Sequence, residues 1–531
     1  MASFTSAERH SLATFARMAY TNPFLAERIK LEHAVLGDQY VPEQIIAWSK
    51  RADQGDRDRL NVERLTTLAT MLVNSFCERL SPESTVDGSL LENYWDTATY
   101  VLYYRHMAQL ERSALVDPGR SLVKIWRTFC EDMHIFAVPL RERQFPLPSA
   151  EHLFACLFQL RRAFLQIYDH ILGDSQPATR LRAMVWQSIF THDMRRYRKT
   201  VYRHLGELPT LITGPTGTGK ELVARAIGLS QYVPFDPQSE KFGCLGDVAF
   251  YPLNLSALSP TLIESELFGH RRGAYTGAAT DRVGWLEACK PAGAVFLDEI
   301  GELDAALQVK LLRVAQQRTF SRLGETDQRH FTGKLIAATN RNLQAELAAG
   351  RFREDLYYRL CADRITTPSL CEQLRDRPTE LRELVTHVSR RIAGDEAEEF
   401  ADEVVAWIEE HLGPNYPWRG NIRELEQCVR NLLVRREYLP LDGECITNPP
   451  VSAANASDPP LTMPPQPAWI MAAWKNELTA DELLRQYCTW VYAQTSSYER
   501  SAERLGLDRR TIKSKVDPEL LRGYQAGKSS S

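Results

Sequence analysis

The chain reads TLITGPTGTGK at residues 210–220, where a short apolar run leads directly into a glycine-rich loop that ends on a lysine. The loop fits the pattern G-x-x-x-x-G-K, and a helix-like segment, residues 221–227, follows it. Glycines let the backbone fold around a phosphate, amides at a helix start attract an anion, and Lys220 can reach the terminal phosphate oxygens. The stretch predicts a strand, a phosphate-binding loop and a helix, which together open a nucleotide-binding α/β sheet.

One position departs from the general pattern of such loops. Glu221 follows the lysine where most of these loops place a Ser or Thr hydroxyl on a magnesium ion, so that role must pass to other groups or to water. The residues predicted to bind the nucleotide are Gly214, Pro215, Thr216, Gly217, Thr218, Gly219, Lys220 and Glu221.

Two later apolar runs, residues 294–297 and 335–338, complete the pattern of a parallel α/β sheet. The first run is followed by Asp298 and Glu299, and open sheets of this kind bind ligands at the carboxyl ends of their strands. Asp298 is expected to hold Mg²⁺ and Glu299 to orient the attacking water, because phosphoryl transfer mainly requires positioning and charge stabilisation. The alternative for an isolated acid pair is a solvated turn, which the phosphate loop about 80 residues upstream disfavours.

Composition limits the class of protein. The chain has 531 residues, of which 44% are hydrophobic and 25% are charged. This balance allows several globular domains. A net charge of -4 means that any nucleic-acid partner must meet a local basic patch. The ten cysteines form no C-x-x-C pair and the N-terminus has no apolar leader, so we expect free thiols and a cytoplasmic location.

The most apolar stretch, residues 152–172, carries its apolar side chains at helical spacing. Gln159, Arg162 and other polar residues fill the opposite face of that helix, and a membrane span would have to desolvate them. The stretch is therefore expected to be a buried helix of a helical N-terminal region, without contact to a membrane.

Across residues 210–428 the chain resembles the central domain of bacterial sigma-54-dependent activators, the enhancer-binding proteins of the AAA+ ATPase class. That family carries Glu after the loop lysine, so Glu221 fits the family pattern. The resemblance is strongest in ESELFGH at 264–270 and GAYTGA at 273–278. It implies ATP and Mg²⁺ as cofactors.

The GAYTGA stretch resembles the polymerase-contacting loop of the family, which is inserted in a helix and presents its aromatic residue and its threonine to the sigma factor. Tyr275 stands where the family usually has Phe. An ordinary glycine turn is the alternative, and the flanking match disfavours it. The resemblance implies sigma-54 contacts from Gly273, Ala274, Tyr275, Thr276, Gly277 and Ala278.

Three further residues match family positions that respond to the nucleotide. Asn340 stands where relatives sense the γ-phosphate, and Asn254 where they have a switch residue that pairs with Glu299. Arg423, in YPWRGNIREL at 416–425, matches an arginine of the helical lid that reads the nucleotide state.

The segment FREDLYYRL at 352–360 resembles the part of the family domain that offers arginines to the nucleotide of the neighbouring subunit. Arg353 and Arg359 are therefore candidate trans-acting fingers, and such a cation contributes about 10³ to 10⁵ in rate. A site completed between subunits implies a homo-oligomeric ring, expected to be a hexamer assembled from dimers.

Residues 501–516, SAERLGLDRRTIKSKV, resemble the helix-turn-helix of these activators. Ala502 allows close helix approach, Gly506 makes the turn and Asp508 can cap the second helix. The side chains expected in the major groove, which also supply the local basic patch, are Arg509, Arg510, Thr511 and Lys513. A solvated basic helix end is the alternative.

The sequence thus predicts a multidomain protein. Its expected parts are an α-helical N-terminal regulatory domain of unknown signal (1–185), a central AAA+ α/β P-loop ATPase core (186–370) with a helical lid (371–440), a Pro-rich linker (441–476) and a C-terminal helix-turn-helix domain (477–531).

The leading hypothesis is an activator that binds double-stranded DNA at an upstream site and remodels the promoter complex of the sigma-54 RNA polymerase holoenzyme by ATP hydrolysis. One rival keeps the fold but acts as a DNA-binding repressor or regulator that does not engage sigma-54. A second rival remodels another substrate and binds no specific DNA. Thr276 and the two loop glycines favour the activator.

Overall fold

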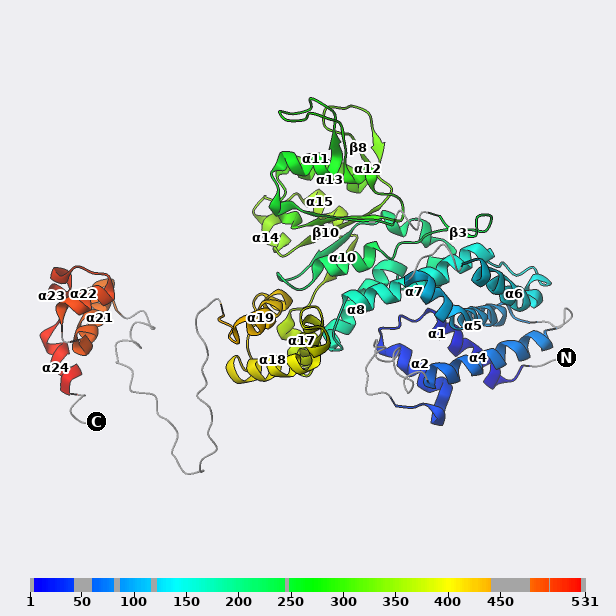
Figure 1. Cartoon of the computed structure of the whole chain (residues 1–531), viewed down its shortest axis with the longest axis horizontal. Coiled ribbons are helices and arrows are strands. Elements are labelled where there is room, and N and C mark those ends of the chain that lie inside the picture. The colour runs from blue at the N-terminus through cyan, green and yellow to red at the C-terminus, as the bar shows by residue number, and fades with distance from the viewer. Residues whose placement is uncertain are drawn as a thin grey trace. The chain divides into compact units, whose positions relative to one another are not determined.

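The computed structural model describes residues 4–42, 60–80, 86–115, 122–243, 248–440, 478–495 and 497–526. Contacts divide the chain into two units, Met1–Asn448 and Pro449–Ser531, each described below by itself. Figure 1 traces both units along the chain. The linker predicted at residues 441–476 lies outside the described residues.

A five-stranded parallel sheet forms the centre of the first unit, with strand order β11-β1-β10-β7-β4. Its strands are β1 (Thr210–Thr213), β4 (Phe250–Asn254), β7 (Ala294–Asp298), β10 (Lys334–Thr339) and β11 (Asp363–Thr366). The three apolar runs of the sequence are β1, β7 and β10, so the predicted parallel α/β sheet is confirmed. The central residues of these three strands are apolar because helices cover both faces of the sheet.

The helices between the strands divide over the two faces (Figure 1). Leu211, Val295 and Leu335 point to the face where α11, α13 and α15 pack, and Ile212, Phe296 and Ile336 point to the face of α10. The helices are α10 (Lys220–Gly228), α11 (Pro260–Phe268), α12 (Trp285–Ala288), α13 (Ala305–Gln317), α14 (Leu343–Ala348) and α15 (Glu354–Leu360).

Three short hairpins project from this layer. They pair β2 (Phe235–Asp236) with β3 (Lys241–Phe242), β5 (Gly269–His270) with β6 (Arg282–Val283), and β8 (Thr319–Phe320) with β9 (Arg329–His330). The 3₁₀ helices of the first unit are Gly37–Gln39, Val201–Arg203, Leu205–Glu207, Leu255–Ala257, Ile300–Glu302 and Gly394–Glu396.

Four helices follow the sheet in the range expected for the lid. They are α16 (Leu370–Asp376), α17 (Glu380–Arg390), α18 (Ala397–His411) and α19 (Asn421–Arg435). Val385, Val404 and Leu425 are among the residues of a core that these helices make for themselves. Ser369 and Glu372 form a capping box at the start of α16, which fixes where the first lid helix begins.

The N-terminal region is helical, as predicted. Its helices are α1 (Ser6–Tyr20), α2 (Ala26–Leu36), α4 (Leu60–Arg79), α5 (Gly88–Leu115), α6 (Leu122–Arg141), α7 (Ala150–His170), α8 (Gln176–Phe190) and α9 (Met194–Lys199). Within the described residues, no helix combines the length and the apolarity that crossing a membrane requires. All eight cysteines of that part of the chain are free.

Helix α7 is the buried helix that the sequence predicts, but its polar face is buried as well. Gln159 is 2% exposed and Arg162 8% exposed, because one side of α7 packs on α5 and α6 and the other on α10. Gln159 Nε2 donates to the carbonyl oxygen of Ser230 at 2.9 Å, and Arg162 donates to the carbonyl of Gln231. These bonds satisfy polar groups that would otherwise be costly to bury.

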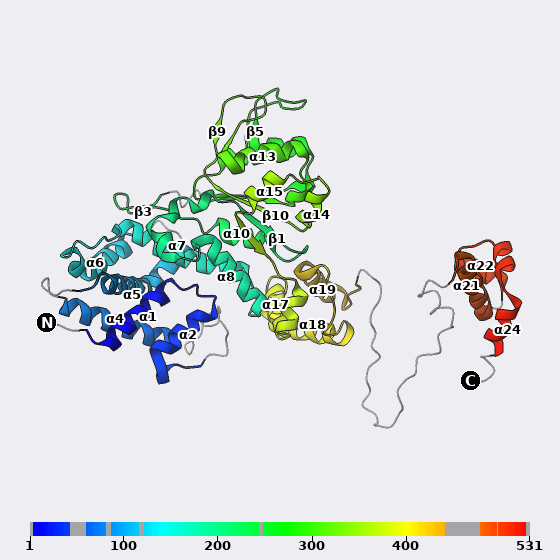
Figure 2. The ribbon, with the colours of Figure 1, turned by 180° about the vertical axis from the view of Figure 1, so that it is seen from behind.

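The predicted domain boundary at residue 185 falls inside α8. Trp186 and Ile189 of α8 share one hydrophobic core with Ile227 of α10 and Ile336 of β10. Figure 2 shows α7 and α8 beside α10, between it and the first helices of the chain. The N-terminal helices and the sheet therefore form a continuous structure.

The described part of the second unit contains α21 (Ala480–Thr495), α22 (Tyr498–Leu505), α23 (Arg509–Lys515) and α24 (Pro518–Ala526). Thr479 and Glu482 form a capping box at the start of α21. Gly506 joins α22 to α23 with φ +62°, and the Asp508 carboxylate accepts from the amide of Arg510 at 2.7 Å. These are the turn and the cap that the sequence predicts.

The shared core predicts the effect of truncation. A chain that begins at residue 186 loses Phe24, Phe164 and Tyr168 from that core. Burial of each such side chain stabilises by about 1.5–3 kcal/mol. We expect its Tm to fall by more than about 10 °C, or the chain to be insoluble. A chain that ends at residue 440 is the control and should keep the Tm of the first unit in a calorimetric scan. Equal Tm values for both truncations would contradict the shared core.

Candidate nucleotide-binding site

Four strands bring polar residues to the carboxyl edge of the sheet. β1 leads into the glycine-rich loop, β7 ends on Asp298, β4 ends on Asn254, and Asn340 follows β10. Asn254 and Asp298 are partners in the register of β4 and β7. The edge is where open parallel sheets bind their ligands, so the predicted site residues gather at the expected place.

The glycine-rich loop has the geometry of an anion-binding turn. Gly217 has φ +76° and Gly219 has φ +81°. Other residues adopt such values only with strain. Lys220 Nζ donates to the carbonyl oxygens of Gly214 and Pro215, both at 3.1 Å, which holds the ammonium group against the loop. Burial lowers the pKa of Lys220, and the negative charges of the nearby acid pair oppose that shift.

The acid pair is connected to the loop through Asn340. The amide of Asn340 donates to Glu299 Oε2 at 3.2 Å, and its Nδ2 donates to Thr216 Oγ1 at 2.8 Å. Glu299 has φ +57°, so its backbone departs from the extended conformation of β7, which ends at Asp298. This is a left-handed conformation that few residues other than glycine adopt. Asn340 thus links Thr216 of the glycine-rich loop to the predicted catalytic acid.

Asn254 lies in the cavity of the site together with Glu299. Its Oδ1 accepts from the amide and the hydroxyl of Ser256, at 3.0 and 2.7 Å. Among the hydrogen bonds of the described residues none joins Asn254 to Glu299, so the switch pair implied by the family resemblance is not formed in this conformation.

The acid pair suits a bound cation. Burial raises the pKa of Asp298, the charge of Glu299 raises it further, and Lys220 opposes both. No group of three or more His, Cys, Asp or Glu side chains within the described part of the chain could hold a metal by itself. The two neighbouring carboxylates of Asp298 and Glu299 are the kind of donor with which proteins hold Mg²⁺, together with phosphate oxygens and water.

The lid contacts the glycine-rich loop directly. Asn421 Nδ2 donates to the carbonyl oxygen of Thr216 at 2.8 Å, and its Oδ1 accepts from the amide of Leu370 at 2.8 Å. The amide of Ile422 donates to the carbonyl of Gly217 at 3.1 Å. A Cβ at Gly217 would lie 2.0 Å from the carbonyl oxygen of Gly420, so only glycine allows this approach.

A cavity of about 510 Å³ lies where these parts meet. This is within the usual size range of ligand sites. Predicted residues that line it are Thr216, Gly217, Thr218, Gly219, Lys220, Glu221, Asn254, Asp298, Glu299 and Arg423. Gly214 and Pro215 form the turn beside it.

The sequence motifs did not predict the apolar part of this site. Ile171, Leu172 and Leu181 come from α8 and from the turn between α7 and α8, and Leu384 and Ile422 come from the lid. These apolar side chains offer a surface for a flat base beside the polar phosphate end. Asn421 is also absent from the predicted site residues, although it lies two positions before Arg423 in the segment 416–425.

Arg353 and Arg359 do not line the cavity of their own chain. Both are exposed on or beside α15, and Arg353 pairs with Asp355 at 2.7 Å. The structure therefore leaves them at the surface of the subunit.

The predicted sigma-contact loop projects between β5 and β6. The amide of Gly273 donates to the carbonyl of Ala278 at 2.9 Å and closes the loop. Thr276 is exposed, whereas Tyr275 is half-buried with its ring 5.1 Å from that of His270. Of these two residues, the threonine is thus the one fully presented in this conformation.

In the second unit, Arg509, Arg510 and Lys513 are exposed on α23 and Thr511 is half-buried. Arg509 pairs with Glu499 of α22 at 2.8 Å. Ile512, between these polar residues, is fully buried against Ala502, which turns the basic face of α23 outward.

Comparison with known proteins gives consistent matches. A family model described as the Sigma-54 interaction domain matches residues 187–366. The chain is 35% identical over 328 residues to the Sigma54-dependent transcriptional regulator SfnR of Pseudomonas fluorescens, covering 58% of this chain and 82% of that protein. It is 42% identical over 254 residues to the transcriptional regulatory protein ZraR of Escherichia coli, covering 48% of this chain and 52% of that protein. The chain therefore spans about half the length of the second relative.

One solved structure, NtrX from Brucella abortus in complex with ATP, is 21% identical and covers 73% of this chain and 80% of that chain. Its TM-score of 0.37 is too low to show a common overall arrangement.

The raised pKa of Asp298 predicts a pH-dependent stability. Below the ordinary Asp pKa the carboxyl is protonated in both the folded and the unfolded chain, so its burial has no ionic cost. The cost grows as pH rises above the unfolded pKa and is complete above the folded pKa. In the nucleotide-free protein, Asp298→Asn should therefore raise Tm at pH 8, and the gain should shrink as the pH falls.

Asp327→Asn, at an exposed site, is the matched control and should leave Tm unchanged at every pH. Thermal unfolding in a pH series checks both variants. A lower Tm for Asp298→Asn at pH 8 would show that the carboxylate stabilises the fold and would contradict the argument.

Proposed function

This chain belongs to the family of sigma-54-dependent transcriptional regulators, and from that premise we propose that it is a cytoplasmic activator that hydrolyses ATP to remodel the promoter complex of the sigma-54 RNA polymerase holoenzyme. The reaction is ATP and water to ADP and phosphate. One observation carries the proposal: the glycine-rich loop and the carboxylate pair share one cavity. The exposed Thr276 on a closed loop of the same domain supports it further.

The nucleotide end of the mechanism follows from the cavity. Amides of the loop and Lys220 bind the β- and γ-phosphates, while the apolar side chains of Ile171 and Leu181 contact the base. Asp298 would hold Mg²⁺, and the bound ion would supply positive charge to the phosphates. Glu299 orients the attacking water, and the amide of Asn340 holds the carboxylate of Glu299 in place.

The arginine positions support a ring. Because Arg353 and Arg359 lie outside the cavity of their own chain, they are available to the nucleotide of a neighbouring copy. Their charge is useful there because the transition state spreads negative charge over the transferred phosphoryl group. We therefore propose that the active form is a homo-oligomeric ring, a hexamer assembled from dimers.

DNA binding is proposed for the second unit. The two helices α22 and α23, with a glycine turn between them, fit the geometry in which a second helix enters the major groove. Arg510 and Lys513 are exposed on that second helix, with Arg509 and Thr511 beside them. This basic face would bring the activator to an upstream site on double-stranded DNA.

A repressor or regulator that does not engage sigma-54 is the second candidate. The inward packing of Tyr275 on His270 favours it, because an activator is expected to present both the aromatic residue and the threonine. The loop closure by Gly273 and the exposure of Thr276 favour the activator.

The division of roles in the cavity predicts two distinct defects. Lys220→Ala removes a charge-assisted contact to the phosphates and should weaken ATP binding about 10-fold or more. Glu299→Gln keeps the shape of the side chain and should leave ATP affinity within about threefold, yet lower kcat by about 100-fold or more. Nucleotide titration and steady-state hydrolysis measure these effects. If Glu299→Gln lost affinity as severely as Lys220→Ala, the assigned roles would be wrong.

The exposed threonine predicts a separation of hydrolysis from activation. Thr276→Ala should keep ATPase activity within about twofold, because substitutions at exposed sites change little else. It should lose the complex with sigma-54 that forms with ADP-aluminium fluoride, because the threonine is the presented contact of the loop. Native gel shift with purified sigma-54 measures the complex.

Thr280→Ala, just beyond the loop and also exposed, is the matched control and should retain the complex. A wild-type protein that hydrolyses ATP but forms no complex would favour the repressor or another remodelled partner.

A further inference from the structure

The nucleotide cavity contains a glutamine that the mechanism proposed above does not use. Gln373 of α16 lines the cavity and is 8% exposed. Its carboxamide makes no hydrogen bond within the part of the chain that the structure describes. The amide nitrogen and oxygen both keep accessible surface, so a bound molecule can reach them. A largely buried amide without a partner is costly, and a ligand that both donates and accepts would satisfy it.

Helix packing places Gln373 at the apolar end of the cavity. Helix α16 packs on α8, which contributes Ala178 and Leu181 to the cavity wall. The amide of Gln176 at the start of α8 donates to Asp376 Oδ2 at the end of α16, at 2.7 Å, and holds the two helices together. The carboxamide of Gln373 therefore lies beside the apolar side chains that are proposed to contact the base.

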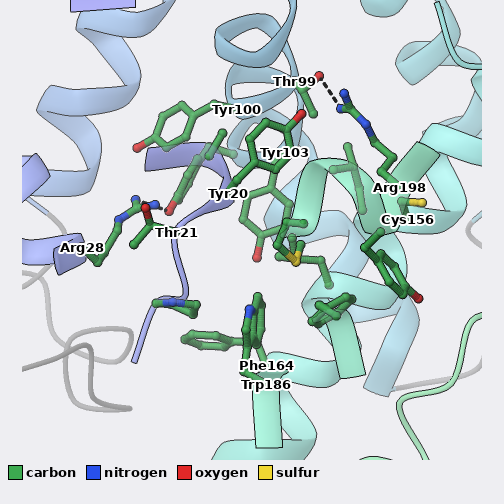
Figure 3. A pocket seen from close by; sticks show the side chains of 18 residues that line it. Tyr20, Thr21, Arg28, Thr99, Tyr100, Tyr103, Cys156, Phe164, Trp186 and Arg198 are labelled. Carbon is green, nitrogen blue, oxygen red and sulfur yellow. Dashed lines mark hydrogen bonds between the residues drawn. The ribbon is translucent and has the colours of Figure 1, made fainter. Parts of the chain in front are cut away.

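Helix α8 also lines a second cavity, among the N-terminal helices and α9 (Figure 3). Trp186 of α8 is one of its lining residues, and the two cavities share no lining residue. The second cavity has a volume of about 80 Å³, against about 510 Å³ for the nucleotide cavity. An engineered apolar cavity that binds benzene has about 150 Å³. Of these two spaces, only the larger can therefore hold a purine.

His170 supplies a further hydrogen-bonding group to the nucleotide cavity, directly before Ile171 in the chain. Its Nδ1 lies 2.8 Å from the carbonyl oxygen of Gln166, which can only accept, so Nδ1 carries the proton. In the neutral imidazole, Nε2 is then an acceptor. The carboxamide of Gln373 adds a second acceptor, Oε1, and one donor, Nε2. This set matches a base that carries an amino group next to a ring-nitrogen acceptor.

Adenine has this arrangement, because its exocyclic amino group lies next to ring nitrogens that accept hydrogen bonds. Amide side chains bond adenine in this way in other settings, through N6 and N7. Guanine carries an acceptor, O6, at the position of the amino group. Two of the three bonding groups contributed by His170 and Gln373 are acceptors, and neither can pair with O6. The site therefore favours adenine over guanine.

We propose that Gln373 determines the base specificity of the nucleotide site: its Oε1 accepts from the exocyclic amino group of adenine, and its Nε2 donates to a ring nitrogen next to that group. The inference rests on the nucleotide site of the proposed function. It adds the residue that selects ATP among the nucleoside triphosphates.

Base selection is measured as binding to the full chain, by competition with an ATP analogue labelled on its ribose. The competitors are ATP, GTP and purine riboside triphosphate, which differs from ATP only in lacking the amino group. The wild type should bind ATP about three- to tenfold more tightly than purine riboside triphosphate, the effect of one hydrogen bond. GTP should bind at least about tenfold more weakly than ATP, because its O6 leaves buried acceptors unpaired.

Two variants of Gln373 separate base recognition from a structural role. Gln373→Met keeps the length of the side chain and removes both bonding groups. It should weaken ATP binding about three- to tenfold and bring the affinities for ATP and purine riboside triphosphate within about twofold of each other. Gln373→Glu keeps the acceptor and should keep a preference for ATP of at least about threefold. A residue that only stabilised the lid would give the same preference in both variants.

Gln427→Met, at an exposed position of α19 outside the cavity, is the matched control and should change no affinity. Equal wild-type affinities for ATP and purine riboside triphosphate would overturn the role of Gln373 and leave the proposed function standing. An unchanged ratio in Gln373→Met would do the same. A chain that binds no triphosphate would overturn both. A chain that selects ATP as predicted but does not hydrolyse it would contradict the proposed function alone.

Discussion

The structure depends on the burial of α10, the helix that begins at Lys220, directly after the glycine-rich loop. One side of α10 packs on the sheet, and its apolar outer side, with Val223 and Ile227, must also be covered. Helices α7 and α8 cover it, and Gln159 and Arg162 satisfy the carbonyl groups of the chain that leaves α10. This is why the N-terminal helices and the ATPase core share a hydrophobic core, and why Ile171 and Leu181 reach the nucleotide cavity.

The phosphate loop is thus held from two sides. The lid contacts it through Asn421 and Ile422, and the N-terminal helices reach it through α10. Between these contacts, the buried carboxylate of Asp298 has a raised pKa that a cation would lower again. The ionised Asp298 carboxylate therefore destabilises the empty site, and a bound cation removes this destabilisation. The lid and the N-terminal helices are both placed to respond to cation binding.

Local patterns sufficed for the phosphate loop, the acid pair, the apolar strands and the cap at Asp508, because each depends on neighbouring residues. Three features depended on tertiary packing and could not be read in this way. Gln159 and Arg162 form a polar helix face that is nevertheless buried. The position predicted for the boundary, residue 185, lies inside α8, whose residues pack into the same core as the sheet. Asn421 bonds the glycine-rich loop and Leu181 lines the cavity, although both come from segments far from the loop in the sequence.

Residues of the N-terminal helices, the phosphate loop and the lid line one cavity, the proposed nucleotide site. Hydrogen exchange with and without a non-hydrolysable ATP analogue tests it most directly. Binding should slow amide exchange in the turn at residues 171–175 and in the lid segment 421–426, together with the loop at 214–221. Slowing confined to the loop and the acid pair, with residues 171–175 unchanged, would contradict it.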